Sequence, residues 1–107
     1  MVIEMNRAPS PFEALADPTR RAILKRLRGG SLSAGEIAEA FQLTKPTLSH
    51  HFRVLRTAGL VRSERHGTTI VYTLQTNVIE DLAAEILELA DRAGTAVPRA
   101  RGKGVLS

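Results

Sequence analysis

The stretch TKPTLSHHFRVLRTAGLVRSER, residues 44–65, decides the fold because it predicts a helix followed directly by a strand. Thr44 is the expected N-cap, and Pro46 falls in the first turn, where backbone N–H groups have no partner within a helix. Gly59 is placed to end the helix. The buried side is predicted by apolar residues that recur at helical spacing: Leu48, Phe52 and Leu55.

Two helices are expected before this stretch. Asp17 followed by Pro18 is a typical helix start, and Gly29 with Gly30 ends that first helix. Its core side is predicted to consist of Ala22, Ile23, Leu24 and Leu27. Its cations are all expected to face outward: Arg20, Arg21, Lys25, Arg26 and Arg28.

The second of these helices begins with the clearest local signal in the chain. Ser33 and Glu36 form a predicted capping box, in which each side chain serves the other residue's backbone N–H. The helix runs to Phe41, and about three residues separate it from the helix that starts at Thr44. This is helix-turn-helix spacing, although the turn lacks the usual glycine.

The sequence after Gly59 predicts a β-hairpin. Residues 61–65 alternate in character, residues 69–74 are rich in β-branched side chains, and Gly67 supplies conformational freedom at the tip. A helix-turn-helix followed by a basic hairpin is a winged helix. The predicted fold is therefore mainly α with a small antiparallel β-hairpin.

Two further helices complete the predicted fold. A short one is expected near residues 11–16, with its apolar side made by Phe12, Leu15 and Ala16. The last helix is expected to start at Asn77, with Glu80 in a box-like arrangement, and to stop at Gly94.

The chain has 107 residues, which is typical of one domain. We expect an irregular arm over residues 1–10 and the winged helix-turn-helix domain, with its dimerisation helices, over residues 11–93. Residues 94–107 are small, basic and rich in Pro and Gly, so we expect a disordered tail.

Composition excludes several classes of site. The sequence has no cysteine, so it can have no disulfide, thiolate metal ligand or cysteine nucleophile. No apolar run approaches the ~18 residues of a membrane span, and the N-terminus lacks the pattern of a signal peptide. We therefore expect a cytoplasmic protein without membrane insertion.

Charge is segregated along the chain, whose net charge is +4. Between Gln42 and Tyr72 the single acid is Glu64, against the cations Lys45, Arg53, Arg56, Arg62 and Arg65. Between Gln75 and Asp91 there is no base, and the acids are Glu80, Asp81, Glu85, Glu88 and Asp91. A clustered basic segment indicates a polyanionic partner; ordinary solvated surface charge is the alternative.

The adjacent residues His50 and His51 cannot face one another on a helix. With about 100° per residue, His50 lies nearly opposite Leu48, while His51 lies at the edge of the buried side. We therefore expect His51 to be half-buried and hydrogen-bonded to nearby backbone. A metal site would need His66 or carboxylates from elsewhere, and catalysis would need a nucleophile, base and acid in one pocket. We predict neither a metal site nor an enzyme.

The outward side of the same helix carries side chains suited to DNA. A recognition helix places its N-terminal residues on base edges in the major groove, where Lys, Ser, Thr, His and Arg supply donors and acceptors. The predicted DNA-binding residues are Lys45, Thr47, Ser49, His50, Arg53, Arg62, Arg65, His66 and Thr68. The alternative is a dimerisation or protein-docking module that does not read DNA, for which neutralising this face would leave the function intact.

The last predicted helix has a wider apolar face than a small domain is expected to cover. Pairing across a two-fold axis would bury the surplus and set two recognition helices ~34 Å apart, one turn of DNA. The predicted dimer interface is Phe12, Leu15, Ile79, Leu82, Ala83, Ile86 and Leu89. The alternative is that this helix packs wholly within its own subunit.

Three segments resemble the ArsR family of bacterial winged-helix repressors: DPTRRAILKRL, SAGEIAEAF and TKPTLSHHFRVLRTAGLVRSERHGTTIVYTL. The likeness is greatest to the SdpR-like autorepressor branch and extends from Phe12 to Leu89. It implies a homodimeric transcriptional repressor, paired through its first and last helices, that binds an inverted-repeat operator. It also implies that Arg65, His66 and Gly67 belong to the wing.

The resemblance bears on sensing as well. Many family members bind metals through cysteines near the recognition helix, or through Asp and His on the last helix. This chain has no cysteine and no histidine after His66, so we expect no thiolate metal-sensing site and no cofactor. Loose binding of a hard cation by the acidic last helix stays open. In the SdpR-like branch a membrane protein relieves repression, so the resemblance implies a protein anti-repressor as a partner.

Overall fold

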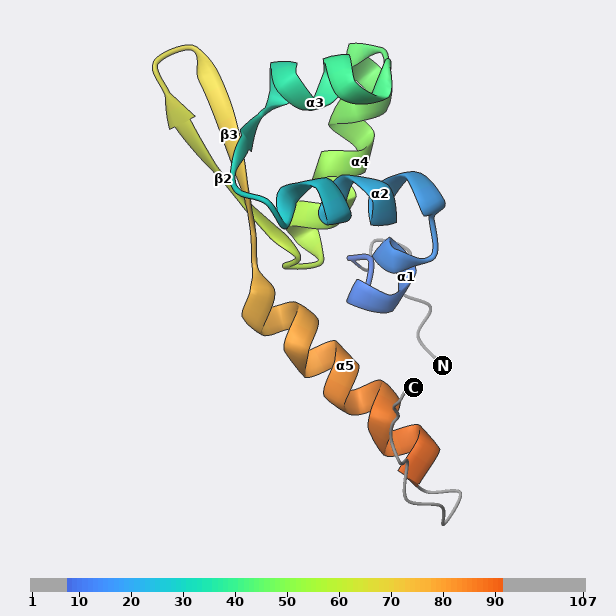
Figure 1. The fold of residues 1–107 in the computed structure, drawn as a ribbon. Helices are drawn as coiled ribbons and strands as arrows, with labels where there is room; N and C mark the ends of the chain where they lie inside the picture. The colour runs from blue at the N-terminus through green and yellow to red at the C-terminus, as the bar shows by residue number, and fades with distance from the viewer. Residues whose placement is uncertain (1–7, 92–107) are drawn as a thin grey trace.

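The computed structural model describes residues 8–91, over which five helices and three strands follow one another (Figure 1). They are α1 (Pro11–Leu15), α2 (Pro18–Leu27), β1 (Leu32–Ser33), α3 (Ala34–Phe41), α4 (Lys45–Thr57), β2 (Val61–His66), β3 (Thr69–Leu74) and α5 (Thr76–Asp91). The predicted class, a mainly helical winged helix-turn-helix, is confirmed. The predicted tail, residues 94–107, and most of the predicted arm lie outside the described residues.

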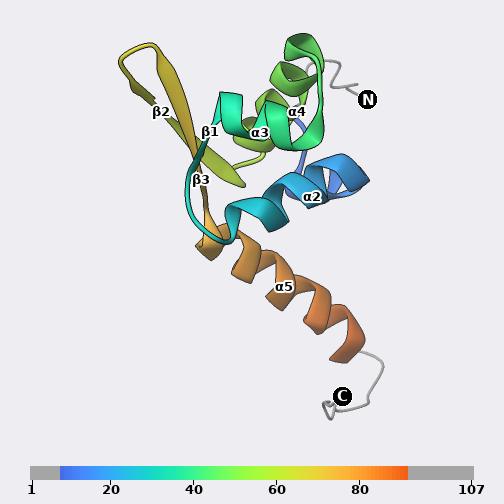
Figure 2. The ribbon, with the colours of Figure 1, turned by 45° about the horizontal axis from the view of Figure 1, so that its top comes forward.

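The hairpin tip and α5 project from opposite ends of the molecule (Figures 1 and 2). Helices α1 to α4 lie together beside the sheet, whereas α5 continues from β3 and runs away from this body. None of the helices within residues 8–91 has the length and apolar character needed to cross a membrane.

Strand β1 is the element that sequence patterns missed. Its two residues pair antiparallel with β3, Leu32 with Tyr72 and Ser33 with Val71, so the sheet has the order β1-β3-β2. Two residues are too few to display the alternation that predicts a strand. The β2–β3 hairpin itself is confirmed, and its closing turn contains Gly67 at φ 67°.

Hydrogen bonds at the helix starts confirm the predicted caps. The backbone N–H of Ser33 donates to Glu36 Oε1 over 2.8 Å, and that of Glu36 donates back to Ser33 Oγ over 3.1 Å. Asp17 Oδ2 accepts from the backbone N–H of Arg20 over 2.9 Å. These bonds satisfy N–H groups that have no partner inside their own helix.

Helix α1 begins at Pro11, as predicted, whereas α5 begins earlier than predicted. A second capping box, between Ser10 and Glu13, starts α1 with bonds of 2.7 and 3.1 Å. Helix α5 begins at Thr76, so Asn77 lies inside it rather than capping it. The backbone carbonyl of Gln75 instead accepts hydrogen bonds from the backbone N–H groups of Val78 and Ile79.

The apolar side predicted for α1 is wrong in part. Ala14 is fully buried, whereas Phe12 is 45% exposed and Ala16 is also exposed. Leu15 is half-buried. Because α1 is a single short turn that lies against α2 and α4, the small side chain of Ala14 sits where the backbones approach closely.

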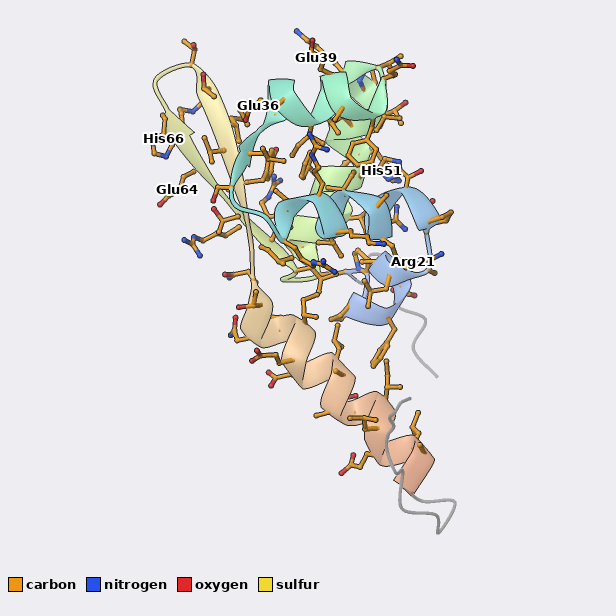
Figure 3. The ribbon with its side chains drawn as sticks, in the orientation of Figure 1. Arg21, Glu36, Glu39, His51, Glu64 and His66 are labelled. Atoms are coloured by element: carbon orange, nitrogen blue, oxygen red, sulfur yellow. The ribbon has the colours of Figure 1, made fainter. Side chains whose placement is uncertain are left out.

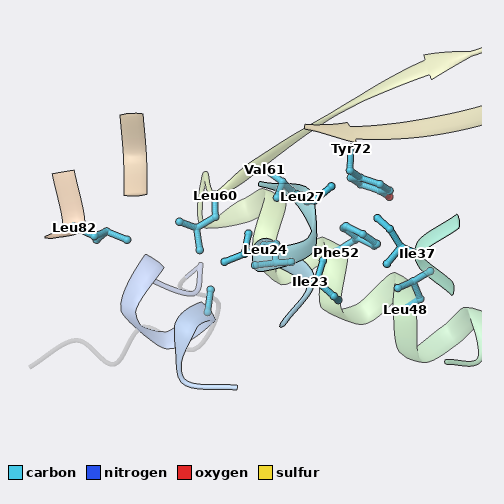
Figure 4. Packing of buried hydrophobic residues seen from close by; sticks show 12 residues of the cluster. Ile23, Leu24, Leu27, Ile37, Leu48, Phe52, Leu60, Val61, Tyr72 and Leu82 are labelled. Carbon is cyan, nitrogen blue, oxygen red and sulfur yellow. The ribbon is translucent and has the colours of Figure 1, made fainter. Parts of the chain in front are cut away.

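The core lies between the sheet and helices α2, α3 and α4 (Figure 4). Phe52 of α4 stacks on Tyr72 of β3, with ring centroids 3.6 Å apart. The predicted buried side of α4 is confirmed, since Leu48, Phe52 and Leu55 are at most 5% exposed. The other large side chains that are fully buried are Ile23, Ile37 and Leu60.

Arg20 does not face outward as predicted. Its Nε donates to the backbone carbonyl of Ala14 over 2.9 Å, and its Nη1 lies 3.3 Å from Nδ1 of His51. His51 is 9% exposed and points between α2 and α4 (Figure 3). Its partner is therefore a guanidinium from α2 and not nearby backbone, which corrects the prediction for His51.

This contact defines the protonation state of His51. A guanidinium is always a donor, so Nδ1 must accept and the neutral ring carries its proton on Nε2. Burial lowers the pKa of His51, Arg20 lowers it further, and Asp17 opposes the shift. The backbone N–H of Arg20 lowers the pKa of Asp17. The joint between α1, α2 and α4 thus favours a neutral His51 beside a charged Asp17.

We expect acid to weaken the fold through His51. Its pKa is lower in the folded than in the unfolded chain, so the unfolded chain binds the proton first as the pH falls. The free energy of unfolding should be level above about pH 7 and fall below about pH 6.5, by at most about 1.4 kcal/mol per pH unit. Urea unfolding across this range measures it.

His51→Asn retains an oxygen that can accept from Arg20 but cannot titrate in this range, so it should remove this dependence. The matched variant His50→Asn changes an exposed neighbour and should keep the wild-type slope. A full slope in His51→Asn would show that another group is responsible.

Candidate nucleic-acid interface

The exposed side of α4 carries five of the predicted DNA-binding residues. Leu48, Phe52 and Leu55 are buried on the opposite side, and this fixes how the helix is rotated about its axis. All five polar residues are exposed: Lys45, Thr47, Ser49, His50 and Arg53. The rings of His50 and His51 have centroids 5.7 Å apart, but one points to solvent and the other into the core.

The start of α4 is held by the turn that precedes it. Gln42, the C-cap of α3, takes the left-handed conformation at φ 53° that a glycine would usually adopt. Thr44 Oγ1 accepts from the backbone N–H of Thr47 over 3.4 Å and donates to its hydroxyl over 2.9 Å. The predicted N-cap is confirmed, and the turn needs no glycine because a polar residue adopts the unusual conformation.

The end of α4 is fixed equally well. Gly59 has φ 83°. Its backbone N–H donates to the carbonyl of Arg56, and the backbone N–H of Leu60 donates to the carbonyl of Leu55. This pair of bonds is the Schellman motif, and the buried Leu60 secures it. The chain therefore turns directly from α4 into β2, so the hairpin has a defined position relative to α4.

The predicted residues of the hairpin lie on two faces. Successive strand residues point to opposite sides, so Arg62 and His66 share one face with Glu64, and Arg65 lies on the other. His66 Nε2 lies 3.3 Å from Glu64 Oε1 (Figure 3), and Arg62 Nη1 donates to Gln75 Oε1 over 3.2 Å at the base of the hairpin. All four predicted residues, Arg62, Arg65, His66 and Thr68, are exposed.

The electrostatic character of this end is positive. Within residues 8–91, Lys45, Arg53 and Arg65 form no ion pair with a carboxylate. Glu64 is the one acid between Gln42 and Tyr72, and it is paired with His66. The N-terminus of α4 and the hairpin tip lie at the same end of the molecule, away from the acidic α5 (Figures 1 and 2).

A small cleft between α3 and α4 was not foreseen from the sequence. It has a volume of about 200 Å³ and opens beside Lys45 and Ser49. Ala34, Gly35 and Ala38 line it from α3, and Leu48 lines it from α4. The run of small residues in AGEIAEA is the signal that could have indicated it.

An exposed helix of donors and cations, positioned by a preceding helix and followed by an exposed hairpin, defines the winged helix-turn-helix proteins that bind DNA. The fold and the arrangement of charge both place this chain in that class. The described residues also contain no group of three or more His, Cys, Asp or Glu side chains gathered as metal ligands would be.

Comparison with known proteins narrows the class. A family profile described as a helix-turn-helix domain matches residues 15–64. Transcriptional repressor SdpR of Bacillus subtilis is 47% identical over 70 residues, covering 65% of this chain and 78% of that protein. HTH-type transcriptional regulator KmtR of Mycobacterium tuberculosis is 39% identical over 88 residues, covering 82% and 68% respectively. A crystal structure of an ArsR family transcriptional regulator superimposes with a TM-score of 0.73 at 29% identity, covering 79% of this chain and 93% of that chain.

The chain belongs to the ArsR family of winged helix-turn-helix transcriptional regulators. This confirms the resemblance found in the sequence, including its likeness to SdpR. Its fold and relatives are those of proteins that bind DNA to regulate transcription, a class distinct from enzymes.

We expect Gln42→Gly to stabilise the protein. A left-handed conformation is strained for a residue with a Cβ and not for glycine, and the Gln42 side chain is exposed. After the greater entropy of an unfolded glycine is subtracted, the free energy of unfolding should rise by about 0.5 kcal/mol. Gln42→Val, with a branched Cβ, should lower it by about 1 kcal/mol. Urea unfolding of the two variants measures both; equal effects would contradict the assignment.

Proposed function

We propose that this protein is a homodimeric transcriptional repressor that binds an inverted-repeat operator and represses its own gene. The observation that carries the proposal is the exposed side of α4, on which Lys45 and Arg53 lie without an acidic partner among residues 8–91. Unpaired cations on a helix whose other side is buried are suited to meet a polyanion.

The roles of the α4 residues follow from their chemistry. Arg53 and Lys45 can each bind the O6 and N7 atoms of guanine in the major groove. Thr47, Ser49 and His50 lie in the first turns, where recognition helices contact bases, and each has a donor or acceptor to offer. We assign direct base contacts to this set.

The hairpin residues are assigned to the DNA backbone and the neighbouring minor groove. Arg65, His66 and Thr68 lie near the projecting tip and are exposed. Arg62 lies at the base of the hairpin and already donates to Gln75, so its contact would be a phosphate rather than a base. Such contacts fix the position of a protein on the duplex without reading its sequence.

Dimerisation rests on apolar surface that one subunit leaves uncovered. Phe12 is 45%, Ile86 51% and Leu89 71% exposed, and Ala83 is exposed as well. Leu15 and Ile79 are half-buried. Leu82 differs, since it is only 6% exposed within the single chain and already packs there. We therefore place Leu82 beneath the interface and the other six residues in it.

The signal that releases the operator is proposed to be a protein rather than a thiolate-bound metal. The sequence offers no cysteine for such a site. A cytoplasmic repressor with a protein anti-repressor is consistent with this composition. Selection of bound sequences from random duplexes, followed by a search of the protein's own promoter for the selected motif, tests the operator and the autorepression together.

Substituting His50 and Arg53 together by Ala is expected to abolish specific operator binding while the dimer persists. Both side chains are exposed, so the fold should be unaffected. Footprinting and sedimentation measure the two properties separately. Arg26→Ala removes another exposed cation, from α2, and is the matched control. Unchanged affinity of the double variant would favour a docking module that does not read DNA.

Operator binding is expected to weaken steeply with salt. If a dimer contacts about 8 phosphates, the logarithm of the association constant should fall with the logarithm of the salt concentration, with a slope of about −7, because counterions are released from the DNA. Removing one phosphate contact, as in Arg65→Ala, should reduce the slope by about 1. Titration of a labelled operator at several salt concentrations measures it, and a flat profile would be incompatible with this interface.

A further inference from the structure

The first turn of α4 directs two hydrogen bonds to one residue, Thr47. Thr44 Oγ1 accepts from the backbone N–H of Thr47 over 3.4 Å and donates its own proton to Thr47 Oγ1 over 2.9 Å. The side chain of an N-cap ordinarily accepts from the second or third residue of its helix. The second residue of α4 is Pro46, which has no N–H, so the cap of this helix can serve only Thr47.

These bonds give the hydroxyl of Thr47 a defined polarity. A threonine hydroxyl has one proton to donate and two lone pairs that accept. Because Thr44 donates to Thr47 Oγ1, one lone pair is occupied and the proton of Thr47 is left to donate elsewhere. No group within residues 8–91 accepts that proton. Thr47 is exposed, and it therefore presents a hydrogen-bond donor to solvent.

The contact with Thr44 also fixes where this hydroxyl lies. A helical threonine commonly divides between two rotamers, because its hydroxyl can instead bond to a carbonyl of the preceding turn. The bond to Thr44 selects the rotamer that holds Oγ1 at the N-terminal end of α4. Around the helix axis Thr47 lies about 60° from His50. The donor thus belongs to the exposed side to which we assign base contacts.

We propose that Thr44 is a positioning residue for DNA recognition: it makes Thr47 a donor, and Thr47 then selects a base that presents an acceptor. In the major groove guanine presents N7 and O6, adenine N7 and thymine O4, whereas cytosine presents only the donor of its N4 amino group. Cytosine is therefore disfavoured at the base that Thr47 contacts. The inference rests on the proposed base contacts of α4 and adds the class of base that one of them selects.

The polarity of the pair matters most once DNA is bound. Both threonines are exposed, so water can satisfy either hydroxyl in the free protein. A base edge displaces that water, and a donor that then faces another donor is left without a partner, which costs more than an ordinary hydrogen bond gains. Thr44 therefore acts on sequence preference through Thr47, without touching the base itself.

The test compares the bases that the full-length chain and its variants prefer at one operator position. Selection with the wild type supplies the operator, and the position that loses its preference in Thr47→Val is the one that Thr47 contacts. In the wild type an acceptor base there should bind about fivefold or more tightly than cytosine. Titration of duplexes that differ only at this position measures the ratio of the two affinities.

Thr44→Asp reverses the polarity of the pair. A carboxylate caps a helix as well as a hydroxyl does, but it has no proton, so Thr47 should donate to it and present lone pairs to the base. The preference over cytosine should fall by about fivefold or more. The added negative charge weakens binding to every sequence alike and cancels in the ratio. Thr44→Asn, which caps through a neutral carbonyl oxygen, carries the same test if the charge prevents all binding.

Two controls separate the orientation of Thr47 from the capping of α4. Thr44→Ser keeps both hydrogen bonds and should keep the wild-type ratio. In a chain that already carries Thr47→Val, Thr44→Asp should leave the base preference unchanged, because there is no hydroxyl to reorient. Circular dichroism checks that each variant is folded.

A fall in the ratio that requires the hydroxyl of Thr47 supports the proposal. A wild-type preference for cytosine at this position, an unchanged ratio in folded Thr44→Asp, or a Thr47→Val chain that keeps every base preference would overturn it. A wild-type chain that selects no sequence would instead remove the base recognition on which the inference rests.

Discussion

The burial of the apolar side of α4 is the constraint on which the rest of the structure depends. Phe52 and Leu55 are at most 1% exposed, and Phe52 is stacked on Tyr72 of the sheet. Burying a large apolar side chain stabilises by roughly 1.5–3 kcal/mol, whereas an exposed ion pair contributes roughly 0.2–1 kcal/mol. The apolar side therefore sets how α4 is rotated about its own axis, and the polar side must face solvent. The DNA-binding surface we propose is a consequence of that packing.

The adjacent histidines illustrate how one rotation gives two residues different chemistry. His50 faces outward with the polar stripe, whereas His51 faces α2 and accepts from Arg20. The Arg20 guanidinium also donates to the carbonyl of Ala14, so one side chain connects α1, α2 and α4. A change in the charge of His51 would act on this joint and only indirectly on the surface of α4.

The segregation of charge has a structural counterpart at each end of the molecule. The cationic end, with α4 and the hairpin, lies away from the acidic α5 (Figure 1). The cations of α2 lie between them and edge an apolar groove. This separation leaves the cationic end clear of the acidic helix, as binding to a polyanion would require.

Sequence alone determined the helices, the hairpin and the polar side of α4, because caps, helical spacing and β-branched runs are local properties. It identified the Ser33–Glu36 box, the Thr44 cap and the buried Leu48, Phe52 and Leu55, all confirmed. Tertiary structure alone decided the pairing of β1 with β3, the inward turn of Arg20 and the burial of Ala14. Each of these depends on which distant segment lies alongside, and a residue's own neighbours in the chain do not encode that.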